Sequence, residues 1–165
     1  RPRGRPSSRR HDVDQPTDLA DRMAAFTLFA GFGTETLIGG AKNDYFLFGQ
    51  DGRFSAGDTV VGGDGYDSFY LRGNYTIDFN APGYTGLFTN IENLTLTSAT
   101  DERYARGGGT EFDYNLTLSD AIVKPGETLT VSGALLTAAE TMVLDASLES
   151  DGFLRIFAGK ADDVL

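Results

Sequence analysis

The sequence predicts an all-β protein: a short parallel β-roll followed by a β-rich region that is either a small sandwich or a continuation of the roll. Two observations lead to this fold class. Glycines recur in phase within a nine-residue pattern, and the rest of the chain alternates short apolar segments with turn residues and shows little helical periodicity. With 165 residues, of which 40% are hydrophobic, the chain is long and apolar enough to bury a core.

One nine-residue segment defines the glycine pattern. Gly62–Tyr70 reads G-G-x-G-x-D-x-U-x, where U is a large apolar residue. A second copy, Gly39–Leu47, has Lys42 at the fourth position, and it directly follows a weaker copy, Ala30–Ile38. Ten of the 21 glycines fall within residues 31–65. Because short in-phase repeats fold as stacked units, this pattern indicates a solenoid.

Two fragments of further copies keep the same phase. Asp58–Val61 supplies the last four positions of a copy whose glycine half is replaced by the longer Phe48–Gly57 stretch. At the other end of the sequence, Ala158–Leu165 begins another copy. The acidic residues of alternate copies are each 23 residues apart: Asp44 with Asp67, and Glu35 with Asp58. The inserted stretch is therefore expected to bulge from one loop without changing the register of the turns.

Each position of the pattern has a physical reason. Glycine tolerates positive φ and lets a tight loop bring several backbone carbonyls to one point. The aspartate adds a carboxylate oxygen, and Ca²⁺ prefers about six to eight oxygen ligands. The last three residues form a very short strand whose large apolar side chain points inward. Two such units make one turn of a parallel roll, so loops two units apart stack on one edge and can hold ions between them.

The pattern resembles the RTX, or haemolysin-type, calcium-binding repeats of bacterial secreted proteins. The resemblance covers residues 30–70 and the incomplete copy at 158–165. It implies a β-roll stabilised by Ca²⁺, export by a type I secretion apparatus and an extracellular location. The residues expected to form the metal sites are Gly31, Gly33, Glu35, Gly39, Gly40, Asn43, Asp44, Asp58, Gly62, Gly63, Asp64, Gly65, Asp67, Asp162 and Asp163.

Two departures from the repeat distinguish the two edges of the expected roll. Lys42 places a cation beside one loop, and Glu35 is a longer, less compact ligand than aspartate. We therefore expect the edge built from Glu35 and Asp58 to bind calcium more weakly than the edge built from Asp44 and Asp67.

The region from residue 71 to residue 157 reads as short strands separated by turns. Asn90–Thr97 resembles the rung that often accompanies such repeat blocks, and its Leu94 and Leu96 are expected to face inward. The expected strands are Tyr75–Phe79, Ile91–Thr97, Phe112–Leu118, Thr128–Val131, Thr141–Leu144 and Phe153–Phe157.

These patterns divide the chain into four parts. Residues 1–25 are expected to be a poorly ordered, Arg-rich tail, within which Thr17–Ala25 could form a short helix. Residues 26–72 form the calcium-binding roll, which Phe26–Phe29 opens as a covering strand. Residues 73–157 form a β-rich spacer module, and residues 158–165 start a second repeat block that the sequence contains only in part.

Composition excludes several classes of function. The net charge is −10 at pH 7, although residues 1–10 hold five arginines and no acid, so the body of the chain repels nucleic acid and attracts cations. Cysteine is absent and the single histidine is His11, which argues against disulfides, thiolate or imidazole metal sites and Ser–His triads. No apolar stretch approaches the roughly 18 residues of a membrane-spanning helix.

Calcium binding without catalysis is the function that these observations favour, in a segment of a secreted bacterial protein whose ions drive folding after export. The alternatives are an accessory region of an extracellular hydrolase or carbohydrate-active enzyme, and part of an adhesin. No catalytic constellation supports an enzyme, because the acids Asp101, Glu102, Glu149 and Asp151 are expected to be solvated loop charges. We also expect Tyr66, Tyr70, Tyr75 and Tyr84 to take part in β packing rather than in a sugar-binding stripe.

Overall fold

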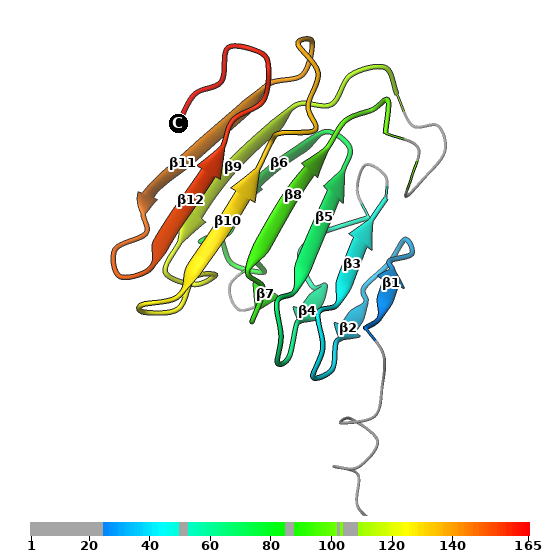
Figure 1. Cartoon of the computed structure of the whole chain (residues 1–165), viewed down its shortest axis with the longest axis vertical. Helices are drawn as coiled ribbons and strands as arrows, with labels where there is room; N and C mark the ends of the chain where they lie inside the picture. The colour runs from blue at the N-terminus through cyan, green and yellow to red at the C-terminus, as the bar shows by residue number, and fades with distance from the viewer. Residues whose placement is uncertain (1–24, 50–52, 85–87, 102, 104–108) are drawn as a thin grey trace, which may run out of the picture.

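The computed structural model describes residues 25–49, 53–84, 88–101, 103 and 109–165. These residues form a parallel β-solenoid of about 4 turns (Figure 1). The predicted all-β parallel roll is confirmed, and the region after residue 72 continues the solenoid rather than forming a separate sandwich. The described residues contain no helix, and hence none long and apolar enough to cross a membrane.

One six-stranded sheet, which we call sheet A, runs the whole length of the solenoid. Its strands are all paired in parallel, each inner strand with the strand from the turn before and the strand from the turn after. In spatial order it consists of β1 (Thr27–Phe29), β3 (Tyr45–Phe48), β5 (Ser68–Arg72), β8 (Asn93–Thr97), β10 (Thr128–Ser132) and β12 (Phe153–Phe157).

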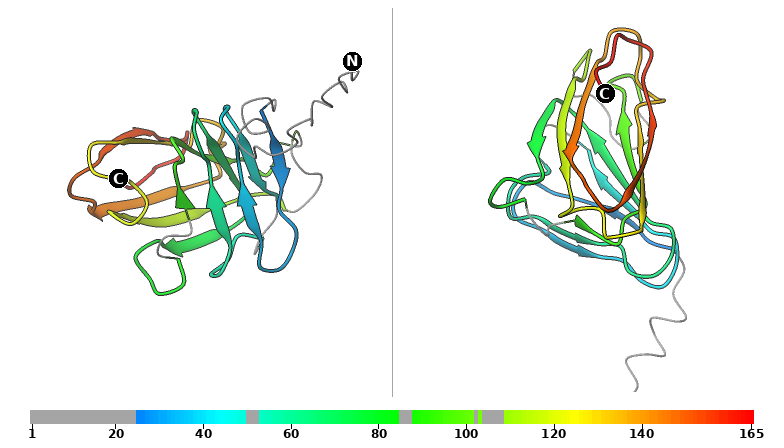
Figure 2. Two further views of the ribbon diagram at one scale, coloured as in Figure 1. Left: turned by 90° about the horizontal axis from the view of Figure 1, so that it is seen from below. Right: turned by 90° about the vertical axis from the view of Figure 1, so that its left-hand side faces the viewer.

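Two three-stranded sheets share the opposite side of the solenoid. Sheet B contains β2 (Thr36–Ile38), β4 (Thr59–Val61) and β7 (Phe88–Thr89), and sheet C contains β6 (Tyr75–Asp78), β9 (Tyr114–Ser119) and β11 (Met142–Leu148). Because β6 and β7 both lie between β5 and β8 in the chain, one turn carries a strand of each sheet. The left view of Figure 2 shows that sheets B and C run in different directions.

The predicted register of the first turns is observed in both sheets. Tyr45 pairs with Ser68 in sheet A, and Thr36 pairs with Thr59 in sheet B, so the turn that contains the insertion is 23 residues long, whereas Thr27 and Tyr45 of the turn before it are 18 residues apart. The large apolar residues of the repeats point inward, as predicted. Three of them are fully buried: Phe46, Val60 and Phe69.

The inserted stretch after β3 does more than bulge from its loop. Phe54 is only 2% exposed, and its ring lies 5.1 Å from that of Phe48 and 5.0 Å from that of Phe69. An aromatic side chain gains far more by burial than by exposure on a loop, so the insertion keeps the register and also fills the core. The sequence pattern predicted only the first of these effects.

The strands predicted after residue 71 all coincide with observed strands to within a few residues. The rung at β8 has Leu94 and Leu96 fully buried, as predicted. The expected Arg-rich tail and the expected helix at Thr17–Ala25 lie outside the described residues, apart from Ala25. The β1 strand falls within the predicted Phe26–Phe29 segment.

Candidate metal centre

The two best repeat copies place their aspartates next to one another on the edge where loops lead into sheet A. The backbone N–H of Asp44 donates to Asp67 Oδ1 at 2.7 Å, and that of Phe26 donates to Asp44 Oδ1 at 2.6 Å. Both aspartates are buried. Each carboxylate therefore bridges to the loop of the preceding turn, and the pair that the spacing predicted is brought together.

Glu92 extends this column by one turn. It precedes β8 just as Asp67 precedes β5, and its Oε2 accepts a hydrogen bond from the Asp67 N–H at 2.7 Å. The repeat pattern does not mark Glu92 as a site residue, because the loop before it lacks glycine and is shorter. The available signal was the shared order of an acid, one residue and a large apolar residue, which Glu92–Leu94 has in common with Asp67–Phe69.

Glycine is required in these loops because oxygen atoms occupy the space of a side chain. A Cβ on Gly62 would lie 1.8 Å from the Asn90 carbonyl oxygen and 2.4 Å from Asp67 Oδ2. In the loop before it, a Cβ on Gly39 would lie 2.1 Å from the Gly62 carbonyl oxygen and 2.5 Å from Asp44 Oδ2. Each glycine thus lies beside one backbone carbonyl and one carboxylate, which are the oxygen ligands that Ca²⁺ takes.

Asp67 Oδ2 is a buried carboxylate oxygen without a hydrogen-bond partner among the described residues. Asp67 is 0% exposed, and this burial raises the pKa of its carboxyl from 3.8 to about 6. The hydrogen bond from the Asp44 N–H lowers the pKa, whereas the charges of Glu92, Asp44 and Asp64 raise it further. An anion in such surroundings lacks the compensating positive charge that buried charges normally have.

The second predicted pair lies on the opposite edge, where loops lead into sheet B. The Glu35 N–H donates to Asp58 Oδ1 at 2.8 Å, and the Ser55 N–H donates to Asp58 Oδ2 at 2.6 Å, so both Asp58 oxygens have partners. The unpartnered oxygen on this edge is Glu35 Oε2. Burial raises the pKa of Glu35, the Asp58 charge adds to this effect, and the nearby Arg53 opposes it.

Arg53 supplies a positive charge close to the carboxylate of Glu35, whereas Lys42, the cation of the loop before Asp44, is exposed. Arg53 Nη1 donates to the Ala30 carbonyl oxygen at 2.6 Å, and its guanidinium lies 4.4 Å from the centre of the Phe32 ring. This cation comes from the inserted stretch. The sequence analysis expected the glutamate to weaken this edge and did not anticipate the arginine.

Other predicted ligands have different roles in the structure. Asn43 and Asp64 are exposed; Asn43 Oδ1 accepts a hydrogen bond from the Tyr66 N–H at 3.0 Å, and the Asp64 N–H donates to the Gly40 carbonyl oxygen at 2.9 Å. Gly63 and Gly65 adopt φ values of 106° and 127°, which favour glycine. These residues shape the loop around the column of acids.

Asp162 and Asp163 lie at the other end of the solenoid and are not brought together with the Asp44–Asp67 column. Asp163 Oδ1 accepts from the Met142 N–H at 2.8 Å, and Asp163 Oδ2 accepts from the Gly159 N–H at 2.6 Å. Asp44 uses its two oxygens in the same way, with the Gly40 N–H bound to Oδ2 at 2.6 Å. The incomplete copy therefore folds as a repeat loop, beside sheet C.

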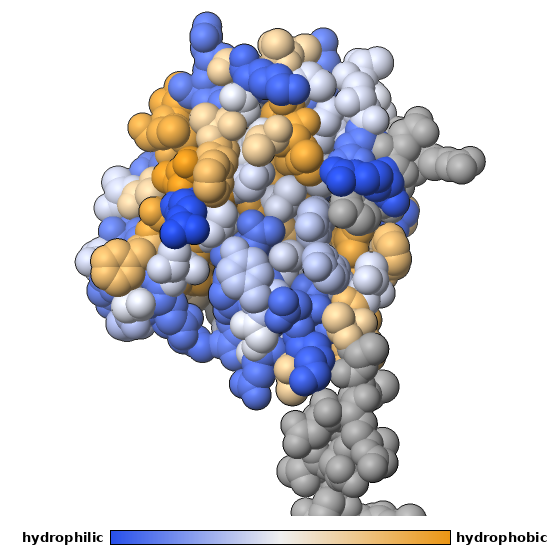
Figure 3. Space-filling view, viewed as in Figure 1, coloured by the Kyte–Doolittle hydropathy of each residue, from blue (hydrophilic) through white to orange (hydrophobic). Residues whose placement is uncertain are grey.

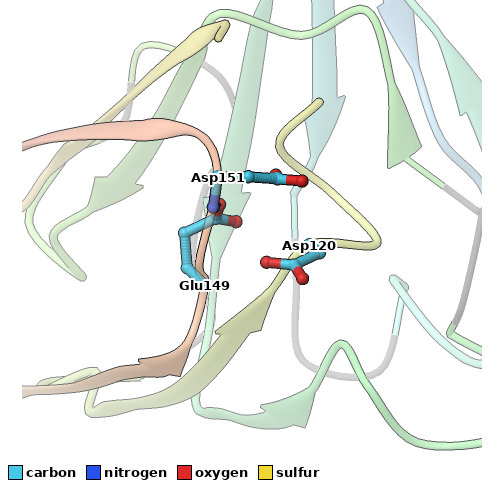
Figure 4. A group of neighbouring side chains, drawn as sticks. All are labelled: Asp120, Glu149 and Asp151. Carbon is cyan, nitrogen blue, oxygen red and sulfur yellow. The ribbon is translucent and has the colours of Figure 1, made fainter. Parts of the chain in front are cut away.

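A separate group of acids lies where β9 and β11 end (Figure 4). Carboxylate oxygens of Asp120, Glu149 and Asp151 lie within 4.8 Å of one another. Asp120 Oδ1 accepts from the Ser150 N–H at 2.6 Å, and Glu149 Oε1 accepts from the Gly152 N–H at 2.7 Å. The first bond ties the end of β9 to the turn between β11 and β12, and the second closes that turn, while Glu149 Oε2 is buried without a hydrogen-bond partner among the described residues.

Comparison of the chain with protein-family models, with curated proteins and with solved structures gave no match.

Proposed function

We propose that the stacked loops 39–44, 62–67 and 90–92 bind Ca²⁺, and that the chain is a segment of a secreted bacterial protein with RTX-type repeats. The observation that carries this proposal is the environment of the carboxylate oxygen Asp67 Oδ2. This oxygen is buried, it has no described hydrogen-bond partner, and it lies beside the Asn90 carbonyl oxygen where Gly62 leaves room. A cation beside these two oxygens would neutralise the carboxylate and satisfy both acceptors.

The donor set favours Ca²⁺ over other metal ions. It consists of carboxylates and backbone carbonyls, and the sequence has no cysteine and only His11 as an imidazole, so the ligands preferred by Zn²⁺ and Cu²⁺ are absent from the loops. Mg²⁺ demands a compact octahedron and gives up its water reluctantly, whereas Ca²⁺ accepts irregular sets of oxygens. Loops built from glycine carbonyls and one acid per turn suit the larger ion.

Calcium binding of this kind would couple folding to export. At cytosolic calcium, far below the roughly 10⁻⁴–10⁻³ M range of extracellular calcium modules, the sites would be empty. The acids of neighbouring turns would then repel one another, and the glycine-rich loops would lose much entropy on ordering. The repeats would therefore order when the chain reaches a calcium-rich medium.

The substitution Asp67→Asn tests the proposal, because its effects with and without calcium have opposite signs. In chelator, the neutral amide can donate to the Asn90 carbonyl oxygen, so the variant should melt at a higher temperature than the parent. In calcium, it should lose most of the stabilisation that the ion gives the parent. Thermal melts in chelator, in Ca²⁺ and in Mg²⁺ measure both effects.

Asp78→Asn is the matched control, since Asp78 is an exposed aspartate on β6 whose Oδ1 accepts only a local hydrogen bond from the Asn80 N–H at 2.9 Å. It should respond to calcium as the parent does. Equal melting temperatures of the parent in all three media would refute calcium binding, and so would identical calcium responses of the Asp67 variant and the parent.

A further inference from the structure

The outer face of sheet A carries a shallow groove of about 350 Å³ that crosses β5, β8, β10 and β12. Figure 3 shows this face, on which polar and apolar residues lie side by side. Four groove residues form one row across the paired strands: Tyr70, Thr95, Ser132 and Phe157. Since neighbouring strands lie about 4.8 Å apart, the two aromatic residues are roughly 14 Å apart, with two hydroxyls between them.

A second row of polar side chains lies on the same face, two residues earlier in each strand. It includes Asn93 and Thr130, which also line the groove. The Asn93 amide donates to Thr95 Oγ1 at 2.9 Å and to Ser68 Oγ at 3.3 Å. These bonds hold the hydroxyls and the amide in place, so the floor of the groove is an ordered array of hydrogen-bonding groups.

Two arginines lie on this face: Arg103, and the exposed Arg155 of β12, which pairs with Thr130 and so belongs to the second row. Arg103 lines the groove and forms a two-point contact with Asp101, with Nε–Oδ1 at 2.8 Å and Nη2–Oδ2 at 2.5 Å. The chain as a whole carries a net charge of −10, which disfavours polyanions such as nucleic acids. The groove therefore suits a neutral ligand.

Two other kinds of occupant fit the groove poorly. A purely apolar ligand would cover the hydroxyls of Thr95, Thr130 and Ser132 and could not use their remaining hydrogen-bonding capacity, which costs free energy. A peptide strand adds to the open edge of a sheet rather than to its face, because it binds through backbone hydrogen bonds. A neutral sugar chain offers what the groove lacks: hydroxyls that both donate and accept, and apolar ring faces that stack on aromatic side chains.

We propose that this groove binds a neutral oligosaccharide, with sugar rings on Tyr70 and Phe157 and sugar hydroxyls on the polar row between them. The distance between the two aromatic rings exceeds one sugar ring, so the ligand is a chain of several units. The four tyrosines considered in the sequence do not form a stripe: Tyr75 is buried and Tyr84 packs 6.0 Å from Phe54. The proposed site instead combines Tyr70 with a phenylalanine from a distant part of the sequence, and it does not depend on the calcium proposal.

Isothermal titration calorimetry in calcium-containing buffer tests the proposal with neutral hexasaccharides of glucose, mannose, galactose and xylose, and with hexagalacturonate as the charged comparison. At least one neutral hexasaccharide should bind. The variants Tyr70→Ala and Phe157→Ala should each weaken that binding by about tenfold or more, which corresponds to about 1.4 kcal/mol. The control Phe153→Ala removes a phenylalanine of the same strand as Phe157 that is 63% exposed and is not among the groove residues, and should leave the affinity unchanged.

Phe157 is 49% exposed, so its truncation should leave the fold intact, which circular dichroism of each variant would verify. Three results would overturn the proposal: no binding of any neutral hexasaccharide, binding of hexagalacturonate alone, or equal affinities of the parent and both groove variants. Calcium titration of the same samples distinguishes these results from a failure of the calcium proposal.

Discussion

The two edges of the first turns use the same repeat but differ in how their carboxylates are satisfied. On the edge leading into sheet A, one oxygen of Asp67 is fully buried and has no described partner. On the edge leading into sheet B, both oxygens of Asp58 accept backbone hydrogen bonds, and the arginine at position 53 opposes the charge of Glu35. On the calcium proposal, the first edge takes an added cation at Asp67 Oδ2, whereas the second offers Glu35 Oε2 beside an arginine.

This difference shows that an acid at the repeat position has two separate uses. It can tie one turn to the next by accepting backbone N–H groups, and it can offer an oxygen to an ion. Asp58 and Asp163 each use one oxygen to accept an N–H of the neighbouring turn and the other to accept an N–H of their own loop. Asp67 has one oxygen without a described partner, and this is the oxygen that we propose binds the ion. A repeat motif alone therefore does not say how many ions a roll binds.

Calcium removal should produce the largest effect and should act mainly on the first edge. An ion present at about 100 times its dissociation constant stabilises the folded state by about 2.7 kcal/mol per site. Hydrogen exchange measured by mass spectrometry in calcium and in chelator should show residues 39–44 and 62–67 losing the most protection without calcium. Residues 114–119 and 142–148 of sheet C should change least. Strong protection of both loops in chelator, unaltered by calcium, would show that they are a static scaffold.

Replacing one glycine by alanine on each edge should destabilise the protein to clearly different extents. In Gly62→Ala, the new Cβ would lie 1.8 Å from a backbone carbonyl oxygen, so we expect a loss at or above the upper end of the roughly 1–3 kcal/mol typical of overpacking. In Gly31→Ala, the nearest atom is the flexible end of Glu35 at 3.0 Å, so the loss should stay below about 1 kcal/mol. Urea unfolding in calcium measures both. Similar losses of stability in the two variants would mean that the space between Gly62 and the Asn90 carbonyl oxygen is not tightly packed.

The pH dependence of stability in chelator should come more from the first edge. Asp67 holds its proton more tightly when folded, with a pKa of about 6 against 3.8, so folding is favoured when it is protonated. This stabilisation should be present at low pH and lost as pH rises through 6, with a total of at most about 3 kcal/mol. Urea unfolding at pH 5 and pH 7.5 should show the fall in the parent and a smaller fall in Asp67→Asn. Parallel pH profiles for the two proteins would contradict the assignment.

The smallest expected effect is that of Glu35→Gln on calcium affinity. Because Arg53 already opposes the charge of Glu35, calorimetric titration should show less than about a threefold loss, against about tenfold or more for Asp67→Asn. A larger loss for the Glu35 variant would reverse the ranking of the two edges.

The sequence predicted the register and the inward-facing residues because both follow from local spacing. Pairs 23 residues apart stack in both sheets, and Phe46 and Phe69 are buried as the repeat requires. The same reasoning predicted the contact between Asp44 and Asp67, since a fixed turn length places equivalent positions next to each other.

Features that depend on side-chain partners in three dimensions could not be predicted in this way. The inward turn of Phe54 depends on space between Phe48 and Phe69, which no repeat pattern records. The roles of Asn90 and Glu92 depend on a loop that lacks the glycines by which the repeat is recognised. The groove on sheet A joins Tyr70 to Phe157 through three strand pairings, which became visible only with the register of the later turns.

Sheet A consists of a single row of strands, each of which touches only the strand before it and the strand after it in the row. In such a one-dimensional array, cooperativity arises from nearest-neighbour interfaces, and order can spread from any turn that forms first. The early turns combine the loops for which we propose calcium binding with a cluster of aromatic rings around Phe69, so we expect ordering to start there and to proceed turn by turn towards β12. Each completed turn then offers an unpaired strand edge on which the next turn can form. Turns could therefore be added or removed without changing the packing inside the others.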